Sequence, residues 1–313
     1  MKYETSFSSF PMKKVTLSAL AALALALHAG PAANAAVPAS SAQPSAVGSS
    51  TASNQVYNQF ESLLKKGRQV EAIKYLNANI AKVSRQQATL MVLHLENELV
   101  KVHSGAINVL SDPKWQAEID SVYKPGDTFM SVLYKVKDWN LRSALKNLSE
   151  MNYRLETSEG LYYPVIRYAA FQKYGKYVAA DIKAYIDIMT VETEKAAAKD
   201  GAIAIGYQEL ANRALAQERF IASYPGSNRA SQVKSLFKNY KAMTFYGLNN
   251  TPLFHYDTKK MQPNAIKGYE LILQANKGKT SGYLKLLQQF MEVAKDNGYK
   301  LTPEVDKFRK ANV

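Results

Sequence analysis

Apolar residues recur at the spacing of an amphipathic helix along most of this chain, most clearly between Tyr207 and Tyr246. In the first part of this stretch one face carries Leu210, Ala211, Ala214, Leu215 and Ile221. In the second part the apolar positions follow i, i+3, i+4, i+7 and i+10: Val233, Leu236, Phe237, Tyr240 and Met243. Between the two parts, Pro225 ends one helix and Ser227 can cap the next. The pattern predicts an antiparallel helical hairpin.

Helical periodicity with clear start signals continues through the rest of the chain from residue 53. Ser84 and Gln87 fit a capping box, and Asp112 before Pro113 places an N-cap residue ahead of a first-turn proline. Helices are expected, among others, at about 263–275, 280–297 and 303–311, and one through Ile182 towards Lys199. The sequence shows no sustained alternation of apolar and polar residues, which is the pattern that would indicate a β-strand. We therefore predict one all-α domain at 53–313, built of antiparallel helical hairpins in an irregular, repeat-like and solenoid-like array.

Two local motifs carry a resemblance to known proteins. The spacing Ala216-x3-Phe220-Ile221-x2-Tyr224-Pro225-x-Ser227-x2-Ala230-x2-Val233 resembles the junction between repeats in tetratricopeptide proteins of bacterial envelopes. The segment 66–73, KGRQVEAI, is similar to the turn inside such a repeat. The stretch from Tyr185 to the Tyr224-Pro225 turn is also similar to a group of secreted proteins of unknown function from Gram-positive spore-formers. These resemblances imply helical hairpins and export, and they imply no activity.

The amino-terminal segment has the pattern of a secretory signal. Lys13 and Lys14 precede an apolar run at 15–27, and Ala33-Asn34-Ala35 offers the small-x-small site that a signal peptidase cleaves. We expect residues 1–35 to be a signal peptide, residues 36–52 to be a disordered linker, and the product to be secreted or held at the cell wall. No other segment reaches the roughly 20 apolar residues of a spanning helix. The chain has no cysteine, so disulfides, thiol catalysis and a lipidated cysteine anchor are all excluded.

The charge of the chain favours an anionic partner. The whole chain carries a formal charge of +14, and removal of residues 1–35 takes away three basic groups and one acidic group, which leaves +12. A basic exported protein is expected to associate with anionic wall polymers, acidic polysaccharide or lipid headgroups, although lysines scattered for solubility would give the same total. Nucleic acid is not expected as a partner, because the chain has no arginine-rich run and no nucleic-acid-binding motif.

Aromatic and basic residues alternate most densely between Gly160 and Tyr177. The candidate binding residues of this segment are Tyr162, Tyr163, Arg167, Tyr168, Tyr174, Lys176 and Tyr177. Tyrosine has an apolar ring and a polar hydroxyl, so such a segment suits either a ligand surface or a helix that packs through its aromatic side chains. The spacing of Tyr163, Arg167 and Phe171 is i, i+4, i+8, which places them on one face if the segment is helical.

A catalytic alternative rests on Glu156 and Glu159. Both precede the aromatic segment, and a glutamate with a raised pKa beside an aromatic cleft is the acid of many glycan-cleaving enzymes. Two glutamates three residues apart also suit the first turn of a helix, where they favour the helix dipole. We therefore keep an envelope glycan-cleaving enzyme as the alternative to a binding protein.

Metal and cofactor sites are not predicted. His94 and Glu98 share one helix face, but HLENE is not the H-E-x-x-H zinc motif, so a surface histidine is the expectation. Gly278-Lys279-Thr280 lacks the glycine five positions earlier that a phosphate-binding loop needs, because Leu273 stands there. The sequence as a whole favours an exported helical protein that binds a wall polymer or a protein partner.

Overall fold

The computed structural model describes residues 47–313, of which 67% are helical, so the predicted all-α class is confirmed. The predicted signal peptide and the first part of the linker, residues 36–46, lie outside the described residues. The linker was expected to extend to residue 52, but helix α2 (Val47–Lys65) already begins at Val47. Within residues 47–313, no helix is long and apolar enough to cross a membrane.

The first half of the described chain contains most of the short helices. Its elements are α2 (Val47–Lys65), α3 (Gln69–Asn79), η2 (Ile80–Lys82), α4 (Arg85–Val109), α5 (Pro113–Val122), α6 (Phe129–Leu133), α7 (Trp139–Glu150), β1 (Tyr153–Ser158), β2 (Leu161–Ile166), η3 (Tyr168–Tyr174) and α8 (Ala180–Glu194). The predicted start of α4 is confirmed, since Ser84 and Gln87 form both bonds of the capping box. The side chain of Asp112 likewise caps α5, with Pro113 in the first turn.

The second half is built around longer helices. Its elements are β3 (Ala198–Lys199), β4 (Ala202–Ile203), α9 (Tyr207–Ser223), α10 (Ala230–Tyr246), β5 (Gly247–Leu248), β6 (Thr251–Pro252), α11 (Pro263–Ala275), α12 (Gly282–Asp296) and α13 (Pro303–Asn312). The last three match the predicted helices closely. Helix α8 ends at Glu194, five residues before the expected end near Lys199, because the chain there turns back in the β3–β4 hairpin.

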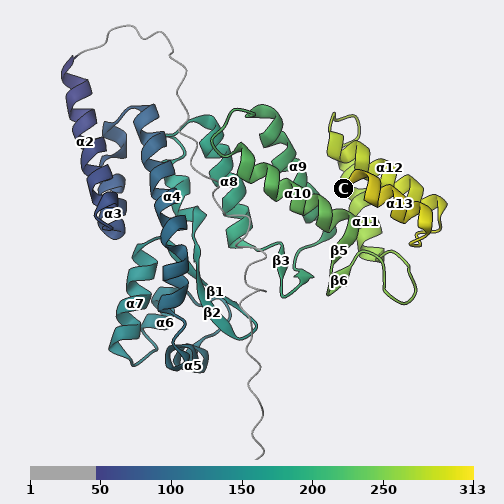
Figure 1. Cartoon of the computed structure of the whole chain (residues 1–313), viewed down its shortest axis with the longest axis horizontal. Helices are drawn as coiled ribbons and strands as arrows, with labels where there is room; N and C mark the ends of the chain where they lie inside the picture. The colour runs from purple at the N-terminus through teal and green to yellow at the C-terminus, as the bar shows by residue number, and fades with distance from the viewer. Residues whose placement is uncertain (1–46) are drawn as a thin grey trace, which may run out of the picture.

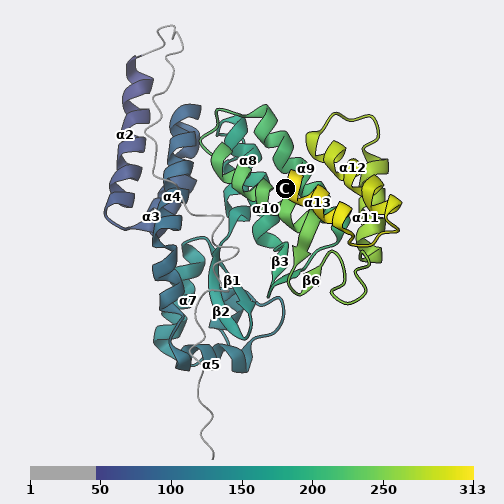
Figure 2. The same cartoon turned by 45° about the vertical axis from the view of Figure 1, so that its right-hand side comes forward.

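The predicted hairpin of α9 and α10 is confirmed, and it joins two hydrophobic cores (Figure 1). At its turn end, Phe220 and Val233 belong to the core of the first half. At its other end, Leu210 and Tyr240 belong to the core of the second half. Figure 2 shows the same order of parts, with α9 and α10 between the α2–α7 region and α11–α13. The hairpin is therefore the element that connects the two halves.

Residues 160–177 do not form the single helix that was considered as the alternative to a ligand surface, and the prediction that strands are absent is wrong at the same place. Strands β1 and β2 form an antiparallel hairpin in which Glu156 lies opposite Tyr163. Its two-residue turn is Glu159-Gly160, with φ of 51° and 75°. Positive φ at both positions matches the right-handed twist of the strands, as in the common Asn-Gly hairpin turn. The short turn and one buried face, which includes Tyr153 and Ile166, override the i, i+4 spacing.

Two smaller hairpins follow the first along one edge of the molecule (Figure 1). The turn of β3–β4, Asp200-Gly201, also has positive φ at both residues, 52° and 71°. The side chains of Ser158 and Asp200 are hydrogen-bonded, which joins the first turn to the second. The Asn250 side chain donates to the carbonyl oxygen of Asp200 at 2.6 Å, which joins the second turn to β5–β6. The three hairpins thus connect the two halves at this edge, as the α9–α10 pair does in the interior.

Candidate functional site

The structure separates the predicted aromatic binding residues into buried and accessible groups. Tyr162, Tyr168 and Tyr174 are buried, and each hydroxyl donates to a side chain of another element: Asp120 at 2.8 Å, Glu96 at 2.5 Å and Asn77 at 2.6 Å respectively. These three tyrosines stabilise the core. Of the other predicted residues, Arg167 and Lys176 are exposed, while Tyr163 and Tyr177 are partly buried. Because β2, a loop and η3 carry them instead of one helix, they form no continuous face.

Glu156 is held as an ionised carboxylate by two cations. Lys199 Nζ lies 2.9 Å from one carboxylate oxygen, and Arg154 Nη2 lies 2.7 Å from the other. Burial alone raises the pKa of Glu156, but the bonds from Lys199 and the Thr157 backbone N–H, with the charge of Arg154, outweigh it and hold the pKa below its usual value. A general acid needs the opposite shift. Glu159 is exposed at the turn of the hairpin, away from any hydrophobic environment that would assist catalysis.

Two further carboxylates are buried where the halves meet, and both are structural. Arg229 makes two bonds to Glu96 Oε2, at 2.8 and 3.0 Å, while the hydroxyls of Tyr168 and Tyr185 donate to Oε1. Glu192 accepts a hydrogen bond from the hydroxyl of Tyr240 at 2.6 Å and lies 3.6 Å from Arg213. Its negative charge is therefore less completely balanced than that of Glu96. Burial raises the pKa of Glu192 above its usual value in spite of these two partners. Both carboxylates are buried, with 5% of Glu96 and 8% of Glu192 exposed, and neither lines the two best-formed hollows of the described surface.

The histidine expectation is consistent with the structure. His94 Nδ1 lies 2.7 Å from Glu61 of α2, so its partner is a neighbouring helix and not Glu98. Within residues 47–313, no group of three or more histidine, aspartate and glutamate side chains could hold a metal ion. The residues that the structure describes therefore suggest no metal centre.

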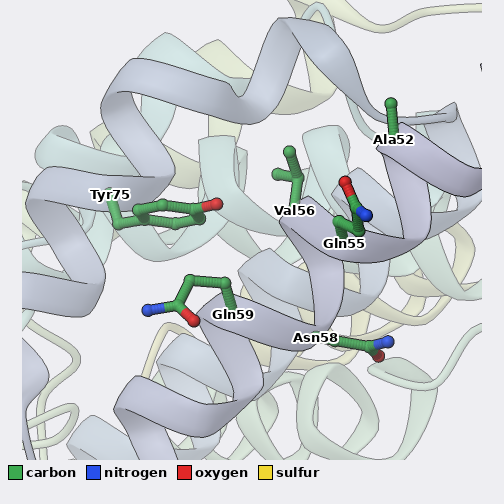
Figure 3. A pocket seen from close by; sticks show the side chains of 6 residues that line it. All are labelled: Ala52, Gln55, Val56, Asn58, Gln59 and Tyr75. Carbon is green, nitrogen blue, oxygen red and sulfur yellow. The ribbon is translucent and has the colours of Figure 1, made fainter.

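The best-formed hollows of the described surface are shallow grooves. One, of about 590 Å³, lies between α2 and α3 and is lined by Ala52, Gln55, Val56, Asn58, Gln59 and Tyr75. In Figure 3 the Tyr75 ring extends from α3 towards Gln59 and Val56, and no charged side chain lines the groove. A second groove of about 470 Å³ follows α13 past Asp306 and Lys307. Neither encloses a ligand as catalytic pockets do.

The strongest feature of the surface is its charge, which is concentrated in the second half. Residues 53–196 contain 19 Lys and Arg against 16 Asp and Glu, a formal charge of +3. Residues 197–313 contain 18 against nine, a formal charge of +9. The total charge of +14 does not reveal this asymmetry, which appears when basic and acidic residues are counted separately in the two halves.

Helix α10 presents the clearest basic surface, which we call the lysine stripe: Lys234, Lys238 and Lys241. Their i, i+4, i+7 spacing places them on one face, about 6 and about 4.5 Å apart along the helix axis. Helix α10 contains no aspartate or glutamate. None of the three lysines forms an ion pair within the described part of the chain.

The lysine stripe continues towards the end of α13. Lys241 Nζ donates to the backbone carbonyl of Asn312 at 3.2 Å, in the last turn of that helix. Lys307 and Lys310 are exposed on α13, and Lys310 is paired with Asp306 at 2.6 Å. The hydrophobic face of α10, which includes Val233 and Tyr240, packs into the cores and fixes the direction of the stripe. The stripe is thus a positively charged ridge on a firmly packed helix.

The fold and the charged ridge define a helical protein with an accessible basic surface. No known protein family matches the chain, and no curated protein or solved structure is similar to it. Function therefore has to be argued from the molecule itself.

Proposed function

We propose that the protein is exported and works by binding an anionic polymer of the cell envelope through the lysine stripe of α10. The observation that carries this proposal is a face of three lysines on a helix without acidic residues, none of which forms an ion pair within residues 47–313. The sequence of residues 1–35 supports export, and the helical hairpins suit a protein that works by presenting a surface.

The chemistry of lysine explains why such a face favours a polymer of negative charges. A lysine without a carboxylate partner can approach an anion without first breaking an ion pair, although Lys241 must first release the Asn312 carbonyl oxygen. A polyanion carries condensed counterions, and each lysine that replaces one releases it, which favours binding at low salt. Lysines on adjacent turns of one rigid helix act together on consecutive charges of the same chain.

Catalysis on wall glycan, through Glu156 or Glu159, is less well supported. Glu156 is paired with Arg154 and Lys199, and its lowered pKa keeps it ionised at neutral pH, where a general acid must hold its proton. Binding without cleavage needs no such group.

The test is retention on insoluble cell-wall sacculi, compared with the same sacculi stripped of their anionic polymer by acid extraction. The purified chain from Ala36 should be retained on intact sacculi and lost as salt rises from about 0.1 M to about 1 M, because the screening length falls from about 10 Å to about 3 Å. Equal retention on stripped sacculi would contradict the proposal. If the protein released soluble glycan fragments from the sacculi, and Glu156→Gln abolished this release, the catalytic alternative would take the place of the binding proposal.

A further inference from the structure

The turn between α12 and α13 contains the only asparagine of the chain that precedes a glycine, Asn297-Gly298. Asn297 is the C-terminal cap of α12, with φ of −95° and ψ of 17°, and Gly298 follows with φ of 63°. Gly298 is exposed, and a Cβ added to it would meet no atom within 4 Å. Glycine has no side chain that would keep its backbone nitrogen away from the preceding side chain. This asparagine is therefore sterically open to attack by the nitrogen of the residue that follows it.

The side-chain amide of Asn297 holds the turn together through three hydrogen bonds. Its Nδ2 donates to the Val293 carbonyl at 2.9 Å and to Glu304 Oε2 at 3.2 Å. Its Oδ1 accepts the hydroxyl of Thr302 at 2.8 Å. Val293 belongs to α12 and Glu304 to α13, so this one amide connects the two helices. While the turn is closed, the amide is engaged in these bonds and is protected from reaction.

Helix α13 is held to the rest of the second half by few buried side chains. Of its ten residues, Val305 and Arg309 are buried. It is also the last helix of the described chain, and elements near chain ends open more readily than the centre of a core. In the closed turn the Gly298 N–H donates to the Lys295 carbonyl at 2.9 Å, so opening of the turn also frees this nitrogen.

We propose that Asn297 is a site of spontaneous deamidation, which reacts when the turn between α12 and α13 opens. The Gly298 nitrogen gives up its proton and bonds to Cγ of Asn297, and the Nδ2 group takes up a proton and leaves as ammonia. Water then opens the resulting five-membered imide at one of its two carbonyl groups. One opening gives aspartate, and the other gives isoaspartate, in which the main chain runs through the side-chain carbons. Asparagine is among the thermolabile residues for which such a reaction is expected.

The product is expected to keep the turn open. A carboxylate donates no hydrogen bond, so its oxygens would face the Val293 carbonyl and the Glu304 carboxylate, which both accept. The new charge would also lie at the C-terminal end of α12, where the helix dipole disfavours an anion. Lys295 and Lys300 in and beside the turn are matched by Asp296 and Glu304, so the lost bonds decide the effect. The modification is independent of the lysine stripe and of the proposed polymer.

Asn276 provides an internal control for the chemistry. It caps α11 with similar backbone angles, φ of −116° and ψ of 19°, and its Nδ2 donates to the Ile272 carbonyl at 2.8 Å. Lys277, and not glycine, follows it. The chain from Ala36 is kept folded at mildly alkaline pH, and trypsin then releases residues 296–300 and 268–277 for mass spectrometry, with a zero-time sample as reference. Deamidation should accumulate several-fold faster in 296–300, and faster still in strong urea.

Opening of the turn is tested by Val305→Ala, which leaves a cavity beneath α13 and does not alter the bonds of Asn297. Deamidation of the folded chain should rise by roughly tenfold. The matched control Val136→Ala removes an equally buried side chain from the first half and should leave the rate unchanged. Equal acceleration by both variants would contradict a local opening. The proposal would be overturned if Asn297 reacted no faster than Asn276, or equally fast in the folded chain and in urea.

The effect of the product is measured with Asn297→Asp, which reproduces one of the two products directly. Amide hydrogen exchange in α13 should be faster by roughly tenfold in this variant, because the bonds to Val293 and Glu304 are lost. Asn276→Asp, at the end of α11, should leave exchange in α13 unchanged. Unchanged exchange in Asn297→Asp would show that the modification does not act on the turn.

Discussion

The two halves of the molecule use their charged side chains differently. In residues 53–196 basic and acidic residues are nearly equal in number, and many form pairs, such as Lys135 with Asp127, Arg154 with Glu156 and Lys183 with Asp187. In residues 197–313 basic residues outnumber acidic ones two to one. The lysines of α10 there form no ion pair with any residue that the structure describes. The difference teaches that the total charge of the chain does not show where on the molecule the basic residues gather, whereas the position of each lysine in the folded chain does.

The boundary between the halves shows the opposite use of charge, as internal structure. Arg229, at the turn of the α9–α10 hairpin, reaches the first half through Glu96 and packs over the Tyr185 ring at 5.6 Å. Glu192 of α8 meets Tyr240 of α10. Here the charged groups are buried and paired with partners from the other half. Removing one partner should therefore weaken the contact between the halves and lower the free energy of unfolding.

The largest effect is expected from Arg229→Ala. It leaves Glu96 buried without a cation, and breaking a buried pair in this way costs about 3–5 kcal/mol of unfolding free energy. Urea unfolding followed by circular dichroism would measure the loss. The double variant Glu96→Gln, Arg229→Gln removes both charges, so its free energy of unfolding should fall clearly less than that of Arg229→Ala. An equal loss in both variants would show that packing, and not the charge pair, joins the halves.

A smaller loss is expected from Gly247→Ala, at the end of α10. Gly247 has φ of 75° and ψ of −153°, a conformation that side chains avoid, and an added Cβ would lie 2.3 Å from the Thr251 carbonyl oxygen. Urea unfolding should show that Gly247→Ala lowers the free energy of unfolding by about 3 kcal/mol. The matched control is Gly105→Ala in α4, where no atom lies within 4 Å and φ is not positive. It should stabilise by about 0.5–1 kcal/mol, so a loss there would contradict the conformational argument.

The smallest effect is a change in pH dependence from Glu192→Gln. Burial raises the folded-state pKa of Glu192 above 4.5, so its contribution to stability is fully present below that pH and is lost as pH rises through the folded-state pKa. The variant should lack this decline, so its stability relative to the native chain should grow as pH rises from 4.5 towards neutrality. Thermal melting from acid to neutral pH measures the difference.

Asp127 provides the contrast for the pH experiment. Bonds from Lys135, the Lys124 backbone and Ser131 lower the pKa of Asp127 from 3.8 to about 2. Its contribution is therefore present above pH 3.8 and lost as pH falls towards 2, the opposite sign. Asp127→Asn should therefore melt below the native chain above pH 3.8, and the difference should shrink as pH falls from 3.8 towards 2. A change of the same sign in both variants would contradict the assignment of the two shifts.

Helical periodicity and capping signals predicted most of the fold. The α9–α10 hairpin, the capping box at Ser84 and the Asp112 N-cap all follow from short-range rules, which is why they could be read from the sequence. The β1–β2 hairpin could not, because Tyr163, Arg167 and Phe171 match a helical spacing as well. The turn signal was Glu159-Gly160, a less familiar pair than Asn-Gly.

Surface function was harder to predict than the fold. The tyrosines chosen from the sequence are partly core residues, since burial of Tyr168 and Tyr174 depends on contacts with α4 and α3 that are distant in sequence. Whether a lysine has a carboxylate partner likewise emerges only when the helices are assembled.

The most direct test of the central proposal replaces the lysine stripe while holding the net charge change constant. The variant Lys234→Gln, Lys238→Gln, Lys241→Gln is compared with Lys267→Gln, Lys285→Gln, Lys295→Gln, three exposed lysines spread over α11 and α12. Affinity for intact sacculi is measured against salt. We predict that the stripe variant binds more weakly, with a log–log salt slope reduced by roughly one per lysine, and that the scattered variant changes far less. Equal losses in the two variants would contradict a site on α10 and attribute binding to overall charge.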